Sequence, residues 1–281
     1  MQNGREFYGK DVCVIEFEKI TSRKNSNVVS AAGLSDKKRR DASGLFFVEG
    51  AKLFEEVLLC GIKVKEVYFT SDAKERHIGL LNEAACRGCK AFEVTPEVYD
   101  RLSSEKSPEG IFAVAEKFLT FERHGAEYAD GGFLILEDVQ DPSNVGTVIR
   151  TACALGIKKI LLTKACADVF GIKCLRASMG ALFRAKIYRT DDLLSELSYF
   201  KEKGIRIIAT SLGDDSEDIS GFSFRDSDCI IIGSEGRGIS DSAEALCDKK
   251  LIIPMEKGAE SLNAAAAAAI FIWEKQKRRN V

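Results

Sequence analysis

The alternation of apolar and polar residues in the first part of the chain predicts a small α/β domain. Short apolar runs indicate strands at residues 46–48, 64–70, 91–94 and 111–115. Helical spacing over residues 53–58 ends before Gly61, a polar helical stretch reaches about Gly88, and Pro96 opens a further short helix. Because strands and helices alternate, we expect a sheet covered by helices.

The second part of the chain repeats this rhythm more strongly. Six apolar runs indicate strands at residues 133–136, 160–162, 185–188, 205–209, 229–232 and 251–253. Helices are expected near residues 145–155, up to Met179, near residues 193–200 and from about Asn263. Short apolar strands separated by helices favour an α/β fold with a mostly parallel sheet flanked by helices on both faces.

Length and composition are consistent with two domains. The chain has 281 residues, of which 45% are hydrophobic, which is enough for two modest cores. Residues 119–132 contain three glycines and little apolar periodicity, which is typical of a linker. We therefore assign residues 31–118 to the first domain and 133–281 to the second, and we leave residues 1–30 as an N-terminal extension without an assigned role.

Several classes of protein are disfavoured by the sequence. No apolar run approaches the ~20 residues that span a bilayer, and no signal-peptide pattern opens the chain, so we expect a cytoplasmic protein with no membrane partner. The nine cysteines are scattered, and Cys86 and Cys89 form a C-x-x-C pair without a second pair. We therefore expect reduced thiols in apolar positions and no metal site.

The distribution of charge limits how this chain would contact nucleic acid. A net charge of −2 argues against coating nucleic acid non-specifically, because that mode needs a broad cationic surface. Any contact with nucleic acid must therefore involve a limited, basic part of the surface. The densest basic run is Lys37, Lys38, Arg39 and Arg40, for which a solvated protein face is the alternative interpretation.

Ligands of parallel sheets bind at the carboxyl ends of the strands, and the first unusual loop at such an end spans residues 137–146. Its Asp-Pro-Ser-Asn sequence predicts a tight turn in which Asn144 caps the following helix. Arg150 interrupts an otherwise apolar helical run. Such a charge needs a partner or a substrate phosphate, unless it lies on the outer face of the helix.

The second unusual loop follows the strand at residues 229–232. Gly233, Gly236 and Gly238 would let the backbone approach a ligand closely. Their G-x-x-G-x-G spacing differs from the G-x-G-x-x-G of dinucleotide-binding proteins and comes late in the chain, which disfavours a nicotinamide-dependent oxidoreductase. A glycine-rich turn before a helix capped by Ser240 is the alternative.

The third unusual loop spans residues 252–263. Pro254 stops the strand, Gly258 provides a bend, and Ser261 or Asn263 is expected to cap the last helix. That helix begins with six alanines and continues with the apolar residues 270–273. We expect it to be buried, with a dimer interface as one explanation.

Together these three loops resemble motifs 1, 2 and 3 of the SpoU/TrmH class of SPOUT methyltransferases. Residues 141–146 with Arg150 resemble motif 1, residues 233–238 resemble motif 2, and residues 253–255 with 261–263 resemble motif 3. The resemblance covers roughly residues 133–281. The chain from residue 46 onward is also similar to the N-terminal substrate-binding domain of this class, which itself resembles a small ribosomal protein.

The resemblance implies a deep trefoil knot that forms a pocket for S-adenosylmethionine, and a homodimer with the active site at its interface. Ten positions are implied to bind the cofactor: Thr210, Ser211, Leu212, Gly233, Glu235, Gly236, Ile253, Met255, Ser261 and Leu262. Five positions are implied to form the catalytic site: Asn144, Arg150, Glu235, Ser261 and Asn263.

The implied reaction is methyl transfer to a ribose 2′-hydroxyl of RNA, and the need for that hydroxyl excludes DNA. Arg150 corresponds to the base proposed for the class, but a guanidinium group ordinarily keeps its proton to pH ~12, so a phosphate clamp is an equal alternative. The predicted RNA contacts are Lys37, Lys38, Arg39, Arg40 and Arg150. Two domains favour ribosomal RNA over transfer RNA. The alternative to an enzyme is a non-catalytic RNA-binding factor in ribosome assembly or resistance.

Overall fold

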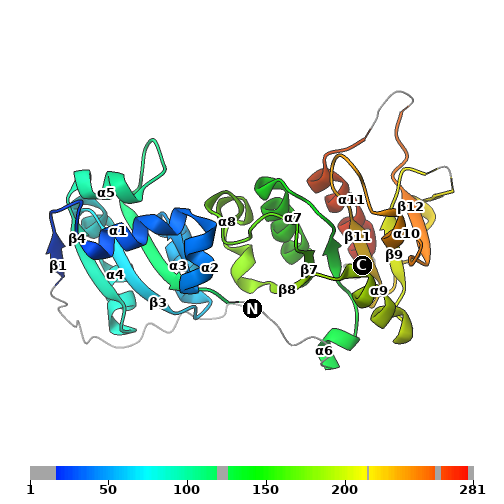
Figure 1. Cartoon of the computed structure of the whole chain (residues 1–281), viewed down its shortest axis with the longest axis horizontal. Coiled ribbons are helices and arrows are strands. Elements are labelled where there is room, and N and C mark those ends of the chain that lie inside the picture. The colour runs from blue at the N-terminus through cyan, green and yellow to red at the C-terminus, as the bar shows by residue number, and fades with distance from the viewer. Residues whose placement is uncertain (1–16, 119–125, 214, 257–260, 278–281) are drawn as a thin grey trace, which may run out of the picture. The chain divides into compact units, whose positions relative to one another are not determined.

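The computed structural model describes residues 17–118, 126–213, 215–256 and 261–277 (Figure 1). The described chain forms two compact units. The first contains the described residues up to Leu34 together with Phe47–Glu116, and the second contains Ser35–Phe46 together with the chain from Lys117 onward. Among the described residues, none of the helices has the length and apolar character needed to cross a membrane.

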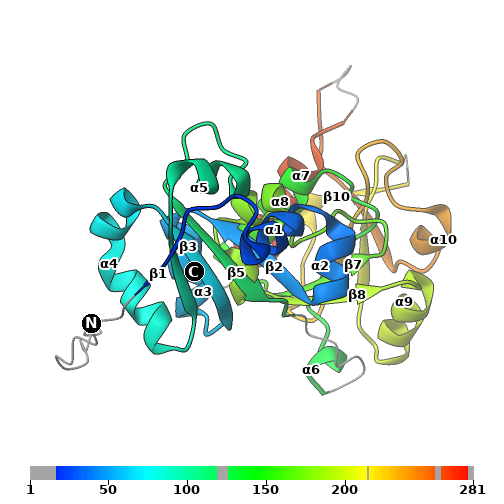
Figure 2. The same cartoon turned by 60° about the vertical axis from the view of Figure 1, so that its left-hand side comes forward.

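The first unit is a five-stranded sheet with helices on both faces. Its strands are β1 (Glu18–Ile20), β2 (Leu45–Glu49), β3 (Val64–Phe69), β4 (Lys90–Val94) and β5 (Ile111–Glu116), in the order β1-β4-β3-β5-β2. The first two residues of β2, Leu45 and Phe46, are grouped with the second unit. Its helices are α1 (Ser26–Ala32), α3 (Ala51–Leu59), α4 (Ser71–Cys86) and α5 (Pro96–Leu102). Helices α1 and α5 pack together, as do α3 and α4 (Figure 2). Strand β4 pairs with β1 and β3 in parallel, whereas β5 runs antiparallel to β3.

The second unit is a seven-stranded parallel sheet. Its strands are β6 (Leu134–Leu136), β7 (Lys159–Thr163), β8 (Lys186–Thr190), β9 (Ile207–Thr210), β10 (Glu217–Asp218), β11 (Cys229–Ile232) and β12 (Lys249–Ile252), in the order β10-β12-β9-β11-β6-β7-β8. Each of the six pairings is parallel. All seven strands therefore end at the same edge of the sheet.

Helices cover both faces of this larger sheet. The helices of the second unit are α2 (Lys37–Ser43), α6 (Ala126–Ala129), α7 (Pro142–Ala154), α8 (Ile172–Ser178), α9 (Leu193–Glu202), α10 (Asp241–Glu244) and α11 (Ala264–Gln276), with short 3₁₀ turns η2 (Ala181–Arg184) and η3 (Ile219–Gly221). The 3₁₀ turn η1 (Gly33–Ser35) contains the last residues of one segment of the first unit and the first residue of the second unit. Helix α7 packs against α8 and α11, and α9 packs against α10 (Figure 1). Alternate strand residues, such as Ile135 and Ile231, enter the core under α9.

The α/β fold with a parallel sheet flanked by helices, predicted from the apolar runs, is confirmed. The pattern of apolar residues did not predict the strand β1 or the helices α1 and α2. β1 has only three residues, the two helices have seven each, and all three bury few apolar side chains. It also placed Ser35–Phe46 in the first domain, whereas this segment packs with the second unit. The predicted linker and N-terminal extension lie partly outside the described residues, at 119–125 and 1–16.

The last helix differs in one respect from its prediction. Helix α11 buries Ala268, Phe271 and Ile272, as expected of an apolar helix. Trp273, however, is 53% exposed, so the apolar turn at residues 270–273 is not buried all round within this chain.

Candidate functional site

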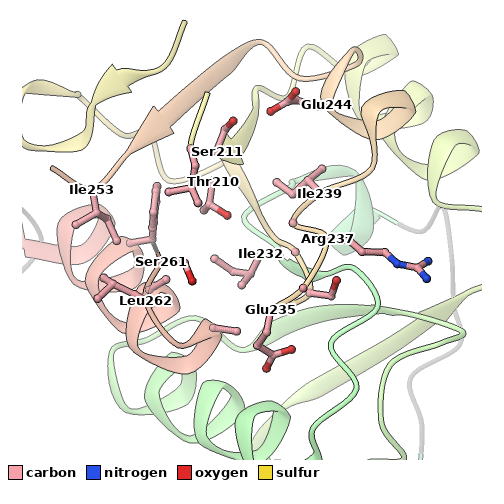
Figure 3. Close-up of a pocket in the computed structure, with 18 of the residues that line it drawn as sticks. Thr210, Ser211, Ile232, Glu235, Arg237, Ile239, Glu244, Ile253, Ser261 and Leu262 are labelled. Atoms are coloured by element: carbon pink, nitrogen blue, oxygen red, sulfur yellow. The ribbon is translucent and has the colours of Figure 1, made fainter. Parts of the chain in front are cut away.

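A cavity of about 450 Å³ lies at the carboxyl ends of β9, β11 and β12 (Figure 3). All ten residues predicted to bind the cofactor belong to its lining: Thr210, Ser211, Leu212, Gly233, Glu235, Gly236, Ile253, Met255, Ser261 and Leu262. Three loops that are separate in the sequence thus form one concave surface. Its volume is in the range of ~300–1,000 Å³ that is usual for small-molecule sites.

The loop after β11 forms one wall of this cavity and is tightly closed. The Ser234 amide donates to the Gly238 carbonyl at 3.1 Å, and the Gly238 amide donates back to the Ser234 carbonyl at 2.9 Å. A Cβ atom on Gly233 would lie only 2.1 Å from the carbonyl carbon of Gly238. Gly233 is therefore required by the close approach of two backbone segments, and Gly238 by its φ of +68°.

A buried carboxylate fixes the end of the same loop. Glu137, at the end of β6, is only 8% exposed. It accepts hydrogen bonds from the Ser240 amide at 3.1 Å and the Ser240 hydroxyl at 2.6 Å, and that hydroxyl caps α10 by accepting from the Ala243 amide. Ser240 thus caps α10, a role that the alternative interpretation of this loop gave it. The role of Glu137 was missed, although a carboxylate at the end of an apolar strand was the available signal.

The opposite wall combines anchored polar groups with exposed apolar side chains. The Thr210 hydroxyl donates to the Ile231 carbonyl, and the Ser211 amide donates to the Leu251 carbonyl, both at 3.0 Å. Leu212 and Leu262 are 57% and 38% exposed although both are large and apolar. A cavity with apolar walls and a few fixed polar groups suits a small ligand that carries an aromatic ring.

The three loops that the sequence singled out, namely residues 137–146, the loop after β11 and the segment before α11, are joined through Asn144. Its amide group donates to the Glu235 carboxylate and accepts at 3.1 Å from the side-chain amide of Asn263. Asn263 also caps α11, because its side-chain oxygen accepts from the amides of Ala265 and Ala266. One hydrogen-bonded chain thus joins a residue from each of the three loops.

The helix cap predicted for Asn144 is wrong, because Asp141 caps α7. The Asp141 carboxylate accepts from the amides of Ser143 at 2.7 Å and Asn144 at 2.9 Å. The hydrogen bond from the Asn144 amide, and then that from Ser143, lower the pKa of Asp141 despite some desolvation, and the charge of Lys173 acts in the same direction. With the cap supplied by Asp141, the Asn144 side chain is available for Glu235 and Asn263.

Two other predicted catalytic residues occupy different surroundings. Ser261 is exposed and lines the cavity. Arg150 lies six residues after Asn144 on α7, is exposed, and does not line the cavity. Among the residues that the structure describes, Arg150 forms no hydrogen bond or ion pair. Gly258, predicted to bend the third loop, lies outside the described residues.

The predicted RNA-binding run on α2 divides into two kinds of residue. Lys37, Lys38 and Arg39 are exposed. Arg40 is only 4% exposed, pairs with Asp168 at 2.7 Å and donates to the Ser35 carbonyl at 2.8 Å. The Arg40 guanidinium group therefore has an internal role, which removes it from the expected RNA contacts.

Two cysteines, the buried Cys174 and the half-buried Cys247, are held in the protonated form. Burial raises the pKa of Cys174 and of Cys247 to about 12, so both remain protonated thiols at neutral pH. In the described part of the chain, no group of three or more histidine, cysteine or acidic residues is arranged to hold a metal ion.

Comparison with known proteins gives two family matches. Residues 132–273 match the SpoU rRNA Methylase family, and residues 17–113 match the MRM3-like substrate binding domain. The 23S rRNA (guanosine(2553)-2'-O)-methyltransferase RlmP of Bacillus subtilis is 30% identical over 262 residues, which are 91% of this chain and 98% of that protein. An uncharacterized tRNA/rRNA methyltransferase of Synechocystis sp. is also 30% identical, over 92% and 94% of the two chains.

A solved structure shows the same fold over both units. The AdoMet-bound rRNA methyltransferase from Sinorhizobium meliloti superposes with a TM-score of 0.84 at 26% sequence identity, covering 93% of this chain and 98% of that one.

Proposed function

Because this chain belongs to the SpoU rRNA methylase family, we propose that it transfers the methyl group of S-adenosylmethionine to a ribose 2′-hydroxyl of ribosomal RNA. The observation that carries this function is the chain of hydrogen bonds from Glu235 through Asn144 to Asn263 beside the cavity. A binding module without catalysis would have no need for three polar side chains from distant loops to meet there.

The cavity fits S-adenosylmethionine by its size and by the chemistry of its lining. Leu212 and Leu262 would cover the adenine ring, and backbone groups near Gly233, Ile253 and Leu262 would bind its polar edge. When bound, the cofactor supplies a methyl group on a positively charged sulfur. Glu235 and Glu244 line the cavity together with Arg237, so acidic side chains outnumber basic ones among the described lining residues, which favours a positively charged ligand.

The residues beside the cavity must act on the ribose that receives the methyl group. The target hydroxyl must be oriented toward the methyl group and must lose its proton. Asn144, Glu235, Ser261 and Asn263 would orient the ribose. Arg150 is a donor only and lies on an exposed helix face, so we assign it the binding of a phosphate next to the target ribose rather than removal of the proton.

In a homodimer, Arg150 of one subunit would reach the cavity of the other subunit. The exposed tryptophan Trp273 lies on α11, which packs against α7, the helix that carries Arg150. A large exposed apolar side chain next to a helix with an unpaired functional charge supports an interface over α7 and α11. We propose that Arg150 of one subunit serves the cavity of the other.

We also propose the trefoil knot. Strand β12 lies beyond β9 toward the edge of the sheet, while α11 packs back against β11 and α7 near its centre. Ile253 and Met255, which follow β12, and Ser261 and Leu262, which precede α11, line the same cavity as the loops after β9 and β11, which supports a threaded path. The likeness of the first unit to a ribosomal protein and the cytoplasmic location remain predictions.

Two measurements test this function. Calorimetry should detect binding of S-adenosylmethionine, and absence of binding at high concentration would refute the enzyme assignment. Mapping of 2′-O-methyl groups in cells with and without the gene should show a lost site in ribosomal RNA. A loss confined to transfer RNA would instead change the substrate class.

Arg150→Ala should retain binding of S-adenosylmethionine and abolish methylation. In a dimer with shared sites, mixing Arg150→Ala with Asn263→Ala should restore part of the activity, because one of the two sites in a mixed dimer would be intact. Wild-type activity of Arg150→Ala alone would remove Arg150 from the site.

A further inference from the structure

The basic helix α2 is attached to the methyltransferase unit and not to the unit that surrounds it in the sequence. Residues 17–113 match a substrate-binding domain, yet Ser35–Phe46, inside that stretch, packs with the second unit. Arg40 binds Asp168 through two nitrogen atoms, at 3.3 and 2.7 Å. The Phe46 ring lies 5.0 Å from that of Phe170.

The attachment point lies on the edge of the sheet that carries the cavity. Asp168 belongs to the loop after β7, and the Ala167 amide in this loop donates to the Val139 carbonyl in the loop after β6 at 2.9 Å. Glu137 then joins the loop after β6 to Ser240 in the loop after β11. Hydrogen bonds therefore connect the anchor of α2 to the wall of the cavity, across two strand spacings of ~5 Å each.

Charges on this edge favour a polyanion. Lys37, Lys38 and Arg39 on α2 are exposed, and none of them forms an ion pair among the residues that the structure describes. Lys173 on α8 is also exposed, and its charge acts on Asp141 at the start of α7. The basic residues thus extend from α2 toward the helix that carries Asn144.

We propose that Lys37, Lys38 and Arg39 bind the phosphates of the RNA strand next to the target ribose, and that Arg40 and Asp168 are positioning residues that hold α2 on the methyltransferase unit. This proposal rests on the proposed function for the identity of the RNA. It assigns part of RNA recognition to the unit that carries out the chemistry.

The first experiment compares two triple variants with the same change of charge. Lys37→Gln/Lys38→Gln/Arg39→Gln removes the basic face of α2. The control, Lys158→Gln/Lys201→Gln/Lys203→Gln, removes three exposed charges at the opposite edge of the same sheet, just before β7 and β9. Fluorescence anisotropy would measure binding of each full-length protein to a labelled ribosomal RNA hairpin over a series of KCl concentrations.

The α2 variant should lower the slope of log K against log salt concentration by about 2, because each lost phosphate contact to a single strand contributes ~0.7. At ~0.1 M KCl this corresponds to binding about 10- to 100-fold weaker, with unchanged binding of S-adenosylmethionine. Equal slopes for the two triple variants would overturn the proposal. This comparison does not require methylation, so it is independent of whether the wild-type protein modifies ribosomal RNA.

The second experiment tests the anchor. Asp168→Asn keeps every proposed RNA contact but removes the charge that holds Arg40. We expect a smaller salt slope and a KM for RNA raised about 10-fold with little change in kcat, and recovery of both in Asp168→Glu. A lower melting temperature with an unchanged salt slope and KM would show that the pair is merely structural.

Discussion

Gly233→Ala should weaken binding of S-adenosylmethionine, because it displaces the loop after β11 that forms one wall of the cavity. The added Cβ would lie 2.1 Å from the Gly238 carbonyl carbon, 2.3 Å from its oxygen and 2.4 Å from the Ile239 nitrogen. All three are backbone atoms, so no side-chain rotation relieves the clash, and the loop must move by about 1 Å. This movement would break the two hydrogen bonds between Ser234 and Gly238, each worth about 1 kcal/mol.

The loss of about 2–3 kcal/mol corresponds to binding of S-adenosylmethionine weakened about 30- to 150-fold, at 1.4 kcal/mol per tenfold change. Isothermal titration calorimetry measures this directly. Gly221→Ala is the control, because nothing lies within 4 Å of a Cβ atom at that position. If Gly233→Ala binds as tightly as Gly221→Ala, the closed loop is not part of the binding site.

Three further predictions concern the loops and the core. Asn144→Asp places a second carboxylate against Glu235, so methylation should fall about 100-fold at pH 8 and recover partly at pH 6; the ratio of mutant to wild-type rates at the two values measures this. Asp141→Ala should cost about 1 kcal/mol at neutral pH. Because the folded-state pKa of Asp141 is lowered, its contribution is present above the ordinary carboxyl pKa and is lost as the pH falls through the lowered value, and urea unfolding at neutral and acidic pH tests this. Arg206→Ala leaves the fully buried Asp228 without its two-pronged partner and should lower the free energy of unfolding by about 3 kcal/mol, against less than ~0.5 kcal/mol for the exposed Arg23→Ala.

The cavity lining was predictable because its signals are local. Gly233 and Pro254 come within two residues of the ends of β11 and β12, and loops at the carboxyl ends of parallel strands must lie side by side. The resemblance to a known class then gave the ten lining positions. Turn chemistry alone did not distinguish Asp141 from Asn144 as the cap of α7, because both residue types favour that position.

What the sequence could not predict depends on contacts between distant residues. Arg40 pairs with Asp168, 128 positions later, and no periodicity reveals such a partner. From the sequence alone, Arg40 cannot be distinguished from its three basic neighbours at positions 37–39. The exposure of Trp273 was equally hidden, because an apolar pattern does not show which of its faces is covered within one chain.

The grouping of Ser35–Phe46 with the second unit determines which shortened forms of this enzyme would keep the second unit intact. Removal of the chain before the predicted linker would take away Arg40 and Phe46, leaving the Asp168 carboxylate, only 15% exposed, without its partner and uncovering the Phe170 and Phe183 rings. The larger segment of the first unit, Phe47–Glu116, is in effect an insertion, entered after Phe46 and left before Lys117, whose amide donates to the Gly44 carbonyl at 2.8 Å. A chain that begins at Ser35 and joins Phe46 to Lys117 by a short peptide would therefore keep the residues of the second unit together, which no simple truncation does.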